Sequence, residues 1–188
     1  MLKYFCPDFR IKSLYDLSPK WLKRNGYNKI VVDVDNTMIP YDKTVVGPRM
    51  MTWIRHMHQQ GINVALITNN GGDRMKAISR QTQLGCVMRA MKPLPTSYKK
   101  IVQGMGGGKI LFIGDQLLTD VLGAKFAGHP VVWCLCERDF HELEIHIIQC
   151  KTNWNDNAQI PMLWDAVYAA KNFRNGVSVG QNNFSVAD

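Results

Sequence analysis

Short apolar runs alternate with longer amphipathic stretches along most of this chain. The apolar runs predict strands at 29–34, 62–68, 86–89, 109–114 and 130–135, and the amphipathic stretches predict helices at 18–25, 48–60, 72–83, 95–104 and 119–127. Pro48 at the start of one predicted helix and Gly61 past its end are typical helix boundaries. Alternating strands and helices favour right-handed parallel crossovers. We therefore expect an α/β fold, with a Rossmann-like parallel sheet flanked by helices.

The chain is long enough for one domain with an adequate core, at 188 residues. We expect that core at 1–136, including a basic N-terminal helical segment, and a helical extension at 137–174 that packs on it. Residues 175–188 are rich in Gly, Asn and Ser and are expected to be disordered. No apolar run approaches a membrane span, and Asp8 and Arg10 argue against a signal peptide, so a cytoplasmic location is expected.

Polar side chains follow the predicted strands where ligands bind in open α/β sheets. The first strand ends in Asp33-Val34-Asp35-Asn36-Thr37, the next in Thr68-Asn69, and the strand at 109–114 in Gly114-Asp115 with Asp120 five residues on. Lys92 stands alone before a proline. Each of these is common without a function, as a strand end, a cap or a surface lysine. Together they predict one site at the carboxyl edge of the sheet.

In these motifs the chain resembles the haloacid dehalogenase-like (HAD) phosphatases. The resemblance rests on Asp33-x-Asp35, Thr68, Lys92 and Asp115 with Asp120. More narrowly, the runs 33–37, 68–70 and 114–123 and the opening Phe5-Cys6-Pro7-Asp8 look like the YqeG-type branch of subfamily IIIA. That branch is related to mitochondrial phosphatidylglycerophosphate phosphatases. The resemblance covers roughly residues 1 to 133, so the remainder is interpreted without it.

The resemblance and the residue types together imply a phosphomonoester hydrolase that works through an aspartyl phosphate. Asp33 is the expected nucleophile, and Asp35 the acid that protonates the leaving oxygen and then activates water. Thr68, Asn69 and Lys92 are expected to bind the phosphoryl group. Asp33, Asp115 and Asp120, with the backbone carbonyl of Asp35, are expected to hold Mg²⁺, which suits oxygen ligands.

The gaps between these motifs are too short for a lid domain. About ten residues separate Thr37 from the helix near Pro48, and 23 lie between Thr68 and Lys92, whereas domains rarely fall below about 50 residues. The resemblance implies that capping domains, when present, occupy those gaps, so the chain looks capless. An open site suits large or surface-bound substrates, and phosphatidylglycerophosphate fits. Phosphatase action on soluble esters or phosphoproteins, and a non-catalytic RNA-binding or assembly factor, remain as alternatives.

The chain is basic, with a net charge of +8, and the first 30 residues hold seven basic and two acidic side chains. Tyr4, Phe5, Phe9, Tyr15 and Trp21 are interleaved with those charges. Such a segment fits peripheral contact with anionic lipid at the inner membrane surface. It equally fits aromatic side chains packed inward with lysines in water, which we favour. Nucleic acid binding has no more specific support than charge.

Two further patterns have ordinary explanations. Five scattered cysteines do not indicate a disulfide framework, and although Cys134-x-Cys136 would share a strand face, its spacing fits no zinc module. We favour buried strand cysteines over a metal site there.

The cluster Gly104-Met105-Gly106-Gly107-Gly108 resembles a phosphate loop, but it precedes a strand. It is therefore expected at the amino edge of the sheet, as a flexible connection.

Overall fold

The computed structural model describes residues 2–135 of the chain. Its sheet has six parallel strands in the order β1-β6-β5-β2-β3-β4. They are β1 (Phe9–Ile11), β2 (Lys29–Asp33), β3 (Asn63–Ile67), β4 (Cys86–Val87), β5 (Ile110–Gly114) and β6 (Val131–Cys134). The predicted α/β class and parallel sheet are confirmed. The domain predictions for 137–174 and 175–188 lie outside the described residues.

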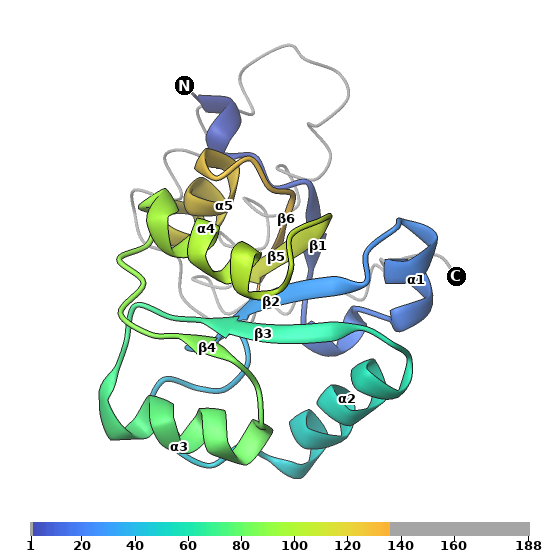
Figure 1. The fold of residues 1–188 in the computed structure, drawn as a ribbon, viewed down its shortest axis with the longest axis vertical. Coiled ribbons are helices and arrows are strands. Elements are labelled where there is room, and N and C mark those ends of the chain that lie inside the picture. The colour runs from blue at the N-terminus through green and yellow to red at the C-terminus, as the bar shows by residue number, and fades with distance from the viewer. Residues whose placement is uncertain (1, 136–188) are drawn as a thin grey trace, which may run out of the picture. The chain divides into compact units, whose positions relative to one another are not determined.

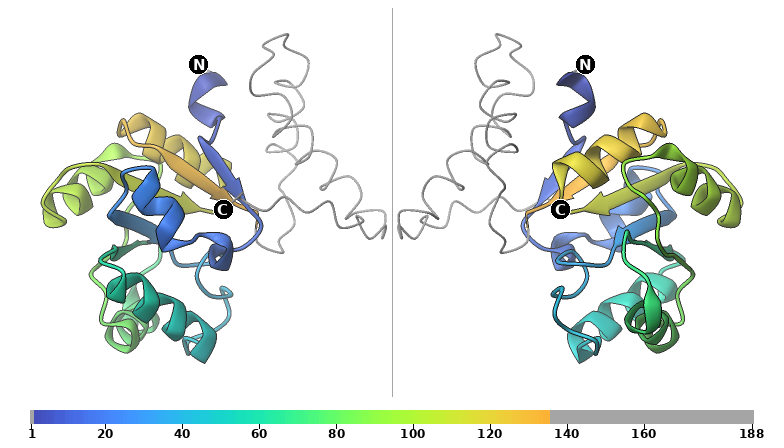
Figure 2. Two further views of the ribbon diagram at one scale, coloured as in Figure 1. Left: turned by 90° about the vertical axis from the view of Figure 1, so that its right-hand side faces the viewer. Right: turned by 90° about the vertical axis from the view of Figure 1, so that its left-hand side faces the viewer.

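Helices cover both faces of this sheet. They are α1 (Pro19–Arg24), α2 (Pro48–Gln59), α3 (Gly72–Thr82), α4 (Pro95–Gly104) and α5 (Leu122–Phe126), with 3-10 turns at Leu2–Phe5 and Leu14–Asp16. Figures 1 and 2 show α2 and α3 on one face and α4 and α5 on the other. All five predicted helices are present, but the one expected at 119–127 begins as a π-helical turn, Leu117–Val121, and continues as α5.

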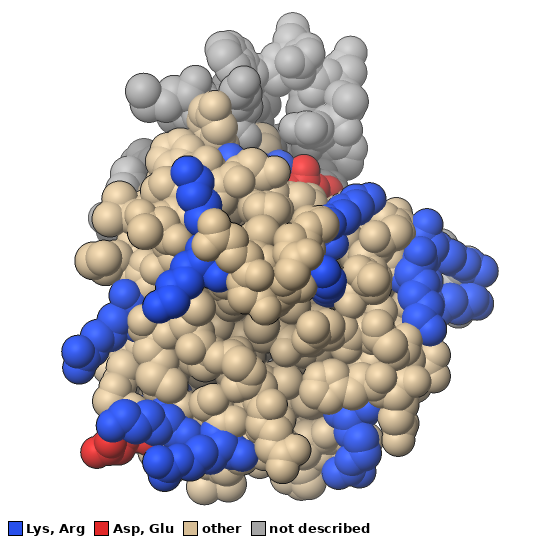
Figure 3. All heavy atoms as spheres, viewed as in Figure 1, with Lys and Arg blue, Asp and Glu red and all other residues tan. Residues whose placement is uncertain are grey.

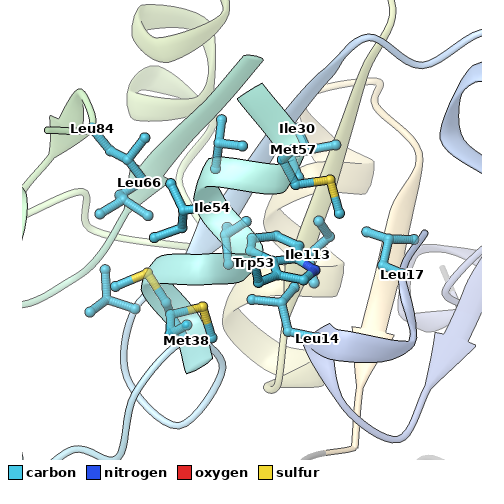
Figure 4. Close-up of a cluster of buried hydrophobic side chains, with 14 of the residues drawn as sticks. Leu14, Leu17, Ile30, Met38, Trp53, Ile54, Met57, Leu66, Leu84 and Ile113 are labelled. Carbon is cyan, nitrogen blue, oxygen red and sulfur yellow. The ribbon is translucent and has the colours of Figure 1, made fainter. Parts of the chain in front are cut away.

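The largest apolar cluster lies between the sheet and the helices α1, α2 and α3. Every second residue of β2, Ile30 and Val32, joins it, as expected for a strand with both faces covered. Figure 4 shows Trp53, Ile54 and Met57 of α2 packed in this cluster, near Leu14 and Leu17. On the opposite face, Val31 and Phe112 are buried toward α4, whose Tyr98 ring lies 5.1 Å from Phe112.

The N-terminal segment differs from expectation in one respect. Strand β1 was not predicted, because Phe9-Arg10-Ile11 is short and pairs with β6, more than 120 residues later. The Asp8 carboxylate supports this pairing by accepting from the Val131 amide at 2.7 Å. Phe9 packs edge-to-face on Trp21 at 4.8 Å between ring centroids, and Trp21 stacks near Tyr27 at 6.3 Å. These contacts support the interpretation in which the aromatic side chains pack inward.

The strand order reverses direction beside β2. The chain runs outward from β2 to β3 and β4, then returns to the other side of β2 for β5 and β6. In open α/β sheets, the crevice at the carboxyl ends of strands around such a reversal binds ligands. Residues that follow β2, β3 and β5 therefore meet at that crevice. No helix among residues 2–135 is long and apolar enough to cross a membrane.

Candidate active site

Three carboxylates and one lysine form the buried base of the site. Asp33 ends β2, Asp115 follows β5, Asp120 comes from the π-helical turn, and Lys92 comes from the loop after β4. Each of the four is at most 8% exposed. Lys92 Nζ donates to Asp33 Oδ1 at 2.5 Å and to Asp120 Oδ1 at 2.6 Å. The structure thus brings together four predicted site residues that are as much as 87 positions apart in the chain.

The charges at this base do not balance among these four side chains. With all of them ionised, three carboxylates against one ammonium leave a net charge of minus two. Burial, reinforced by Asp120 and Asp115, raises the pKa of Asp33 from 3.8 to about 8, although Lys92 opposes the rise. Burial by itself lowers the pKa of Lys92, but Asp120 and Asp33 together raise it above its ordinary value. The ammonium therefore stays charged, and the carboxylates need either a proton or a further cation.

A divalent cation fits this arrangement. Oxygen atoms of Asp33, Asp115 and Asp120 lie within 4.8 Å of one another, and no other group of this kind was found between residues 2 and 135. Three carboxylate oxygens are the ligand type that Mg²⁺ prefers, and two positive charges would neutralise the excess. Cys134 is buried in β6, apart from this group, and Cys136 lies outside the described residues. The candidate metal ligands among the described residues are therefore Asp33, Asp115 and Asp120.

Asp120 reaches the site because Gly114 leaves room for it and hydrogen bonds hold its turn. A Cβ on Gly114 would lie 2.3 Å from the Asp120 Cγ, so a larger residue cannot occupy that position without displacing the carboxylate. Asp120 Oδ2 accepts from the Gln116 amide at 3.1 Å. The Tyr98 hydroxyl donates to the Thr119 carbonyl at 3.0 Å, and burial raises the Tyr98 pKa, which keeps this donor protonated. These contacts hold the π-helical turn that aims Asp120 at Lys92.

Asp35 belongs to a second, more exposed group of polar side chains. Its Oδ2 accepts from Asn70 Nδ2 at 2.8 Å and from Thr68 Oγ1 at 3.2 Å. Its Oδ1 accepts from Arg74 Nη1 at 2.6 Å. The turn after β2 aims Asp35 at this group through Asn36, whose φ of 60° is accessible to Asn at low cost. The two predicted catalytic carboxylates therefore have different surroundings, one buried beside Lys92 and one in a network of donors.

Arg74 also ties this network to the loop after β2. Its Nε donates to the Lys43 carbonyl at 2.8 Å and its Nη2 to the Pro40 carbonyl at 3.2 Å. The planar guanidinium thus uses all three nitrogens, which suits Arg and not Lys. Arg74 on α3 was missed from the sequence, because one basic residue on an amphipathic helix resembles an ordinary solvent-facing charge.

Asn69 lies at the site but makes a different contact from the one expected. The prediction placed it on the phosphoryl group. In the structure its Oδ1 accepts from the Lys92 amide at 2.6 Å, and its Nδ2 donates to the Lys92 carbonyl at 3.2 Å. The side chain therefore fixes the loop that carries Lys92. Asn70, Arg74 and Tyr98 are site residues that the sequence analysis did not single out.

The glycine cluster lies where it was expected, at the other edge of the sheet. Residues 106–108 precede β5 with positive φ angles, and the Gly107 carbonyl accepts from Lys29 Nζ at 2.8 Å. Lys29 begins β2, so this contact marks the amino edge. Lys109 at the same edge donates to the Asn25 carbonyl at 2.6 Å. The cluster therefore takes no part in the site formed by Asp33 and Lys92.

Comparison with known proteins gives a consistent assignment. A sequence profile of haloacid dehalogenase-like hydrolases matches residues 12–128. The chain is 33% identical over 132 residues to a protein from Bacillus subtilis (strain 168) described as "Probable phosphatase YqeG", covering 69% of this chain and 77% of that protein. Residues 12–128, which the family profile matches, contain all the site residues described above.

Two other matches have lower sequence identity and give weaker support for this assignment. A chloroplastic/mitochondrial phosphatidylglycerophosphate phosphatase 1 from Arabidopsis thaliana is 25% identical over 131 residues, and the alignment covers 64% of this chain but only 38% of that protein. The crystal structure of a hypothetical protein, XCC2798 from Xanthomonas campestris, superposes with a TM-score of 0.50 at 20% identity, covering 87% of this chain and 93% of that one. The structural match supports the fold alone.

Proposed function

The chain belongs to the haloacid dehalogenase-like hydrolase family and is a phosphatase of that type, and we propose that it hydrolyses phosphate monoesters through an aspartyl phosphate on Asp33. The observation that carries this proposal is the buried Asp33 carboxylate at the end of β2, held by Lys92 at 2.5 Å. A buried carboxylate fixed beside a cation is positioned to attack an electrophile whose negative charge that cation neutralises.

In the first step, an Asp33 oxygen attacks phosphorus and the bond between phosphorus and the ester oxygen breaks. Asp35 donates a proton to that leaving oxygen. The Lys92 ammonium neutralises the phosphoryl oxygens, and the Thr68 hydroxyl donates to one of them. Because Thr68 and Asn70 donate to Asp35 in this structure, the phosphoryl group competes with Asp35 for these donors.

In the second step, water attacks the phosphorus of the aspartyl phosphate. Asp35, now deprotonated, accepts a proton from that water. The bond between phosphorus and the Asp33 oxygen breaks, inorganic phosphate leaves, and Asp33 returns as a carboxylate. One proton passes to the alcohol and one is taken from water, so Asp35 ends each cycle as it began.

Mg²⁺ is the cofactor that we assign to Asp33, Asp115, Asp120 and the Asp35 carbonyl. The first three provide the close-set oxygen atoms, and their excess negative charge matches a divalent ion. When bound, Mg²⁺ would offset the charge of the phosphoryl oxygens and keep Asp33 ionised. We assign to Asn69 the role of positioning the backbone of Lys92. Contact between the Asn69 side chain and the phosphoryl group is a secondary proposal.

The substrate we propose is phosphatidylglycerophosphate or a similar phosphate ester presented on a surface. The resemblance to YqeG-type phosphatases supports this, as does the 25% identity to a phosphatidylglycerophosphate phosphatase. Within residues 2–135, no inserted domain covers the site, because only a loop separates β2 from α2, and α3 fills most of the interval between β3 and β4. Such an open site admits a phosphate attached to a large object.

The test is Mg²⁺-dependent phosphate release from an aryl phosphate and from phosphatidylglycerophosphate in mixed micelles. Wild type, Asp33→Asn and Asp35→Asn are compared with Asp73→Asn, a control that changes an exposed carboxylate on α3. Lipid turnover far above aryl turnover, lost in the first two variants alone, supports the proposal. Aryl turnover without lipid turnover would support the proposed reaction but not the lipid substrate. The substrate would then be a soluble phosphate ester or a phosphoprotein. No turnover of either, by folded protein, makes a non-catalytic binding factor the better explanation.

A further inference from the structure

Exposed apolar side chains occur in the loops that carry or hold site residues. Five large apolar residues among 4–135 are at least half exposed, and three of them are Tyr41 at 64%, Met91 at 64% and Leu94 at 53%. These three lie in the loops that follow β2 and β4. The fourth, Val45, lies farther along the loop after β2, where Gln81 near the end of α3 accepts from the Val46 amide and donates to the Thr44 carbonyl, and the fifth, Phe126, lies in α5 and contacts Tyr4. We call Tyr41, Met91 and Leu94 the apolar rim.

Both loops of the apolar rim are anchored to site residues. Arg74, which holds Asp35, also donates to the Pro40 and Lys43 carbonyls on either side of Tyr41. In the other loop, the Arg89 amide donates to the Asn70 carbonyl at 2.9 Å. Met91 immediately precedes Lys92, whose ammonium reaches Asp33. The rim therefore lies in the same loops that carry Lys92 and are held by Arg74 and Asn70.

Two basic side chains lie in the same loops as the rim. Arg89 is exposed in the loop after β4, and Lys43 in the loop after β2 pairs with Asp42 at 3.0 Å while both stay in solvent. Separate apolar side chains on loop tips, interleaved with cations, suit the boundary between head groups and acyl chains. A protein partner instead requires one contiguous, well-packed patch.

The basic side chains of helix α1 lie at the other edge of the sheet. Lys23 in α1 donates to Gln60, which precedes β3, and Lys109 donates to Asn25, which precedes β2. These contacts place α1 with its exposed lysines at the amino edge of the sheet, opposite Asp33. Basic side chains outnumber acidic ones on the face drawn in Figure 3. A membrane bound at α1 would turn the active site toward solvent.

We infer that the apolar rim, and not the basic helix α1, is the surface that contacts an anionic lipid bilayer and brings the site to a membrane-borne phosphate ester. This inference rests on the proposed function, because it names where that substrate is met. Apolar side chains enter the interface while Arg89 and Lys43 meet lipid phosphates. Docked in this way, the entrance between the two loops opens onto the layer that holds the substrate.

The experiment measures sedimentation of the full chain with vesicles of phosphatidylcholine, alone or mixed with phosphatidylglycerol. The test variant is Tyr41→Asp with Leu94→Asp, which places charge on both loops. Its matched control is Phe126→Asp, and Lys20→Gln with Lys23→Gln and Arg24→Gln tests the amino edge. Thermal unfolding and near-ultraviolet circular dichroism check that each variant folds.

We expect wild type to bind the phosphatidylglycerol vesicles and the rim variant to bind them at least tenfold more weakly. The control and the amino-edge variant should keep most of their binding. The ratio of micelle-bound to aryl phosphate turnover should fall in the rim variant alone. Absence of wild-type binding, or binding lost in the amino-edge variant but kept in the rim variant, overturns the inference. Rim-dependent binding without aryl or lipid turnover would retain the docking surface and refute only the proposed function.

Discussion

Arg74 of α3 holds Asp35 at 2.6 Å while its other two nitrogens hold the carbonyls of Pro40 and Lys43. One side chain therefore sets both the position of the proposed acid and the loop that forms half of the site entrance. Both Asp35 oxygens accept hydrogen bonds in this structure, so an incoming phosphate ester must displace a donor before Asp35 meets the leaving oxygen.

Replacement of Arg74 should impair turnover more than binding. We expect Arg74→Ala to lower kcat for an aryl phosphate by about tenfold to a hundredfold, at or below the lower limit of the range for losing a positioned acid, because Asp35 itself remains. Arg74→Lys should recover only part of this loss, because lysine cannot hold three acceptors in one plane. Steady-state kinetics resolve kcat from KM. Arg80→Ala, an exposed change on the same helix, is the control, and equal kcat values for Arg74→Ala and Arg80→Ala would exclude the role.

Lys92 is expected to be essential for stability as well as for chemistry. Lys92→Met removes the one ammonium that contacts Asp33 and Asp120 and leaves buried carboxylates facing one another. Loss of one partner from a buried ion pair costs about 3–5 kcal/mol. Urea unfolding should show a loss of this size without Mg²⁺, and added Mg²⁺ should restore more stability to the variant than it adds to wild type. An unchanged midpoint would contradict this electrostatic account, with the exposed Lys76→Met as the comparison.

Binding of Mg²⁺ should be linked to proton release from Asp33. Without metal, burial and the neighbouring carboxylates raise the pKa of Asp33 from 3.8 to about 8. Between these values the folded state holds a proton that the unfolded chain has lost, so this group's contribution to stability falls as pH rises toward 8. Mg²⁺ must displace that proton at lower pH.

The Mg²⁺-induced rise in Tm should therefore grow from pH 6 to pH 8.5. Thermal unfolding at fixed Mg²⁺ and ionic strength measures it, and isothermal calorimetry in buffers of different ionisation enthalpy counts the protons released. Asp33→Asn should remove most of the pH dependence. A Tm shift that is constant over this range in wild type would argue against the coupling.

Gly114 should tolerate no side chain. In Gly114→Ala the new Cβ would lie 2.3 Å from Asp120 Cγ, so either β5 or the π-helical turn must move. We expect destabilisation of about 2 kcal/mol or more, since overpacking of a close-packed interior typically costs about 1–3 kcal/mol, together with weaker Mg²⁺ binding. Gly85→Ala is the matched control, because nothing lies within 4 Å of its added Cβ. Near-native Mg²⁺ affinity in Gly114→Ala would show that Asp120 does not depend on this clearance.

Much of the fold could be predicted from the sequence because its signals are local. Apolar runs and amphipathic periods located β2, β3 and β5 and the helices between them within a few residues. The polar residues after those strands then located the site, since parallel strands carry their carboxyl ends to one edge. Asp33, Thr68 and Asp115 needed only this topology to be placed together.

What the sequence could not decide depends on contacts between distant segments. Strand β1 exists because β6 offers an edge to a three-residue run too short to predict a strand by itself. Arg74 and Tyr98 become site residues only when helices α3 and α4 pack beside the loops that they hold.

By itself, the sequence determined the α/β class, the order of the elements and the residue types that meet at the carboxyl edge. Hydrophobic burial acts through periodic patterns along the chain, and those patterns can be recognised without coordinates. Only the tertiary structure decided which neighbours surround Asp33 and Asp35, and which charged surface lies at the entrance. Hydrogen bonds and electrostatic interactions depend on distances of a few ångströms between residues that are far apart in the sequence.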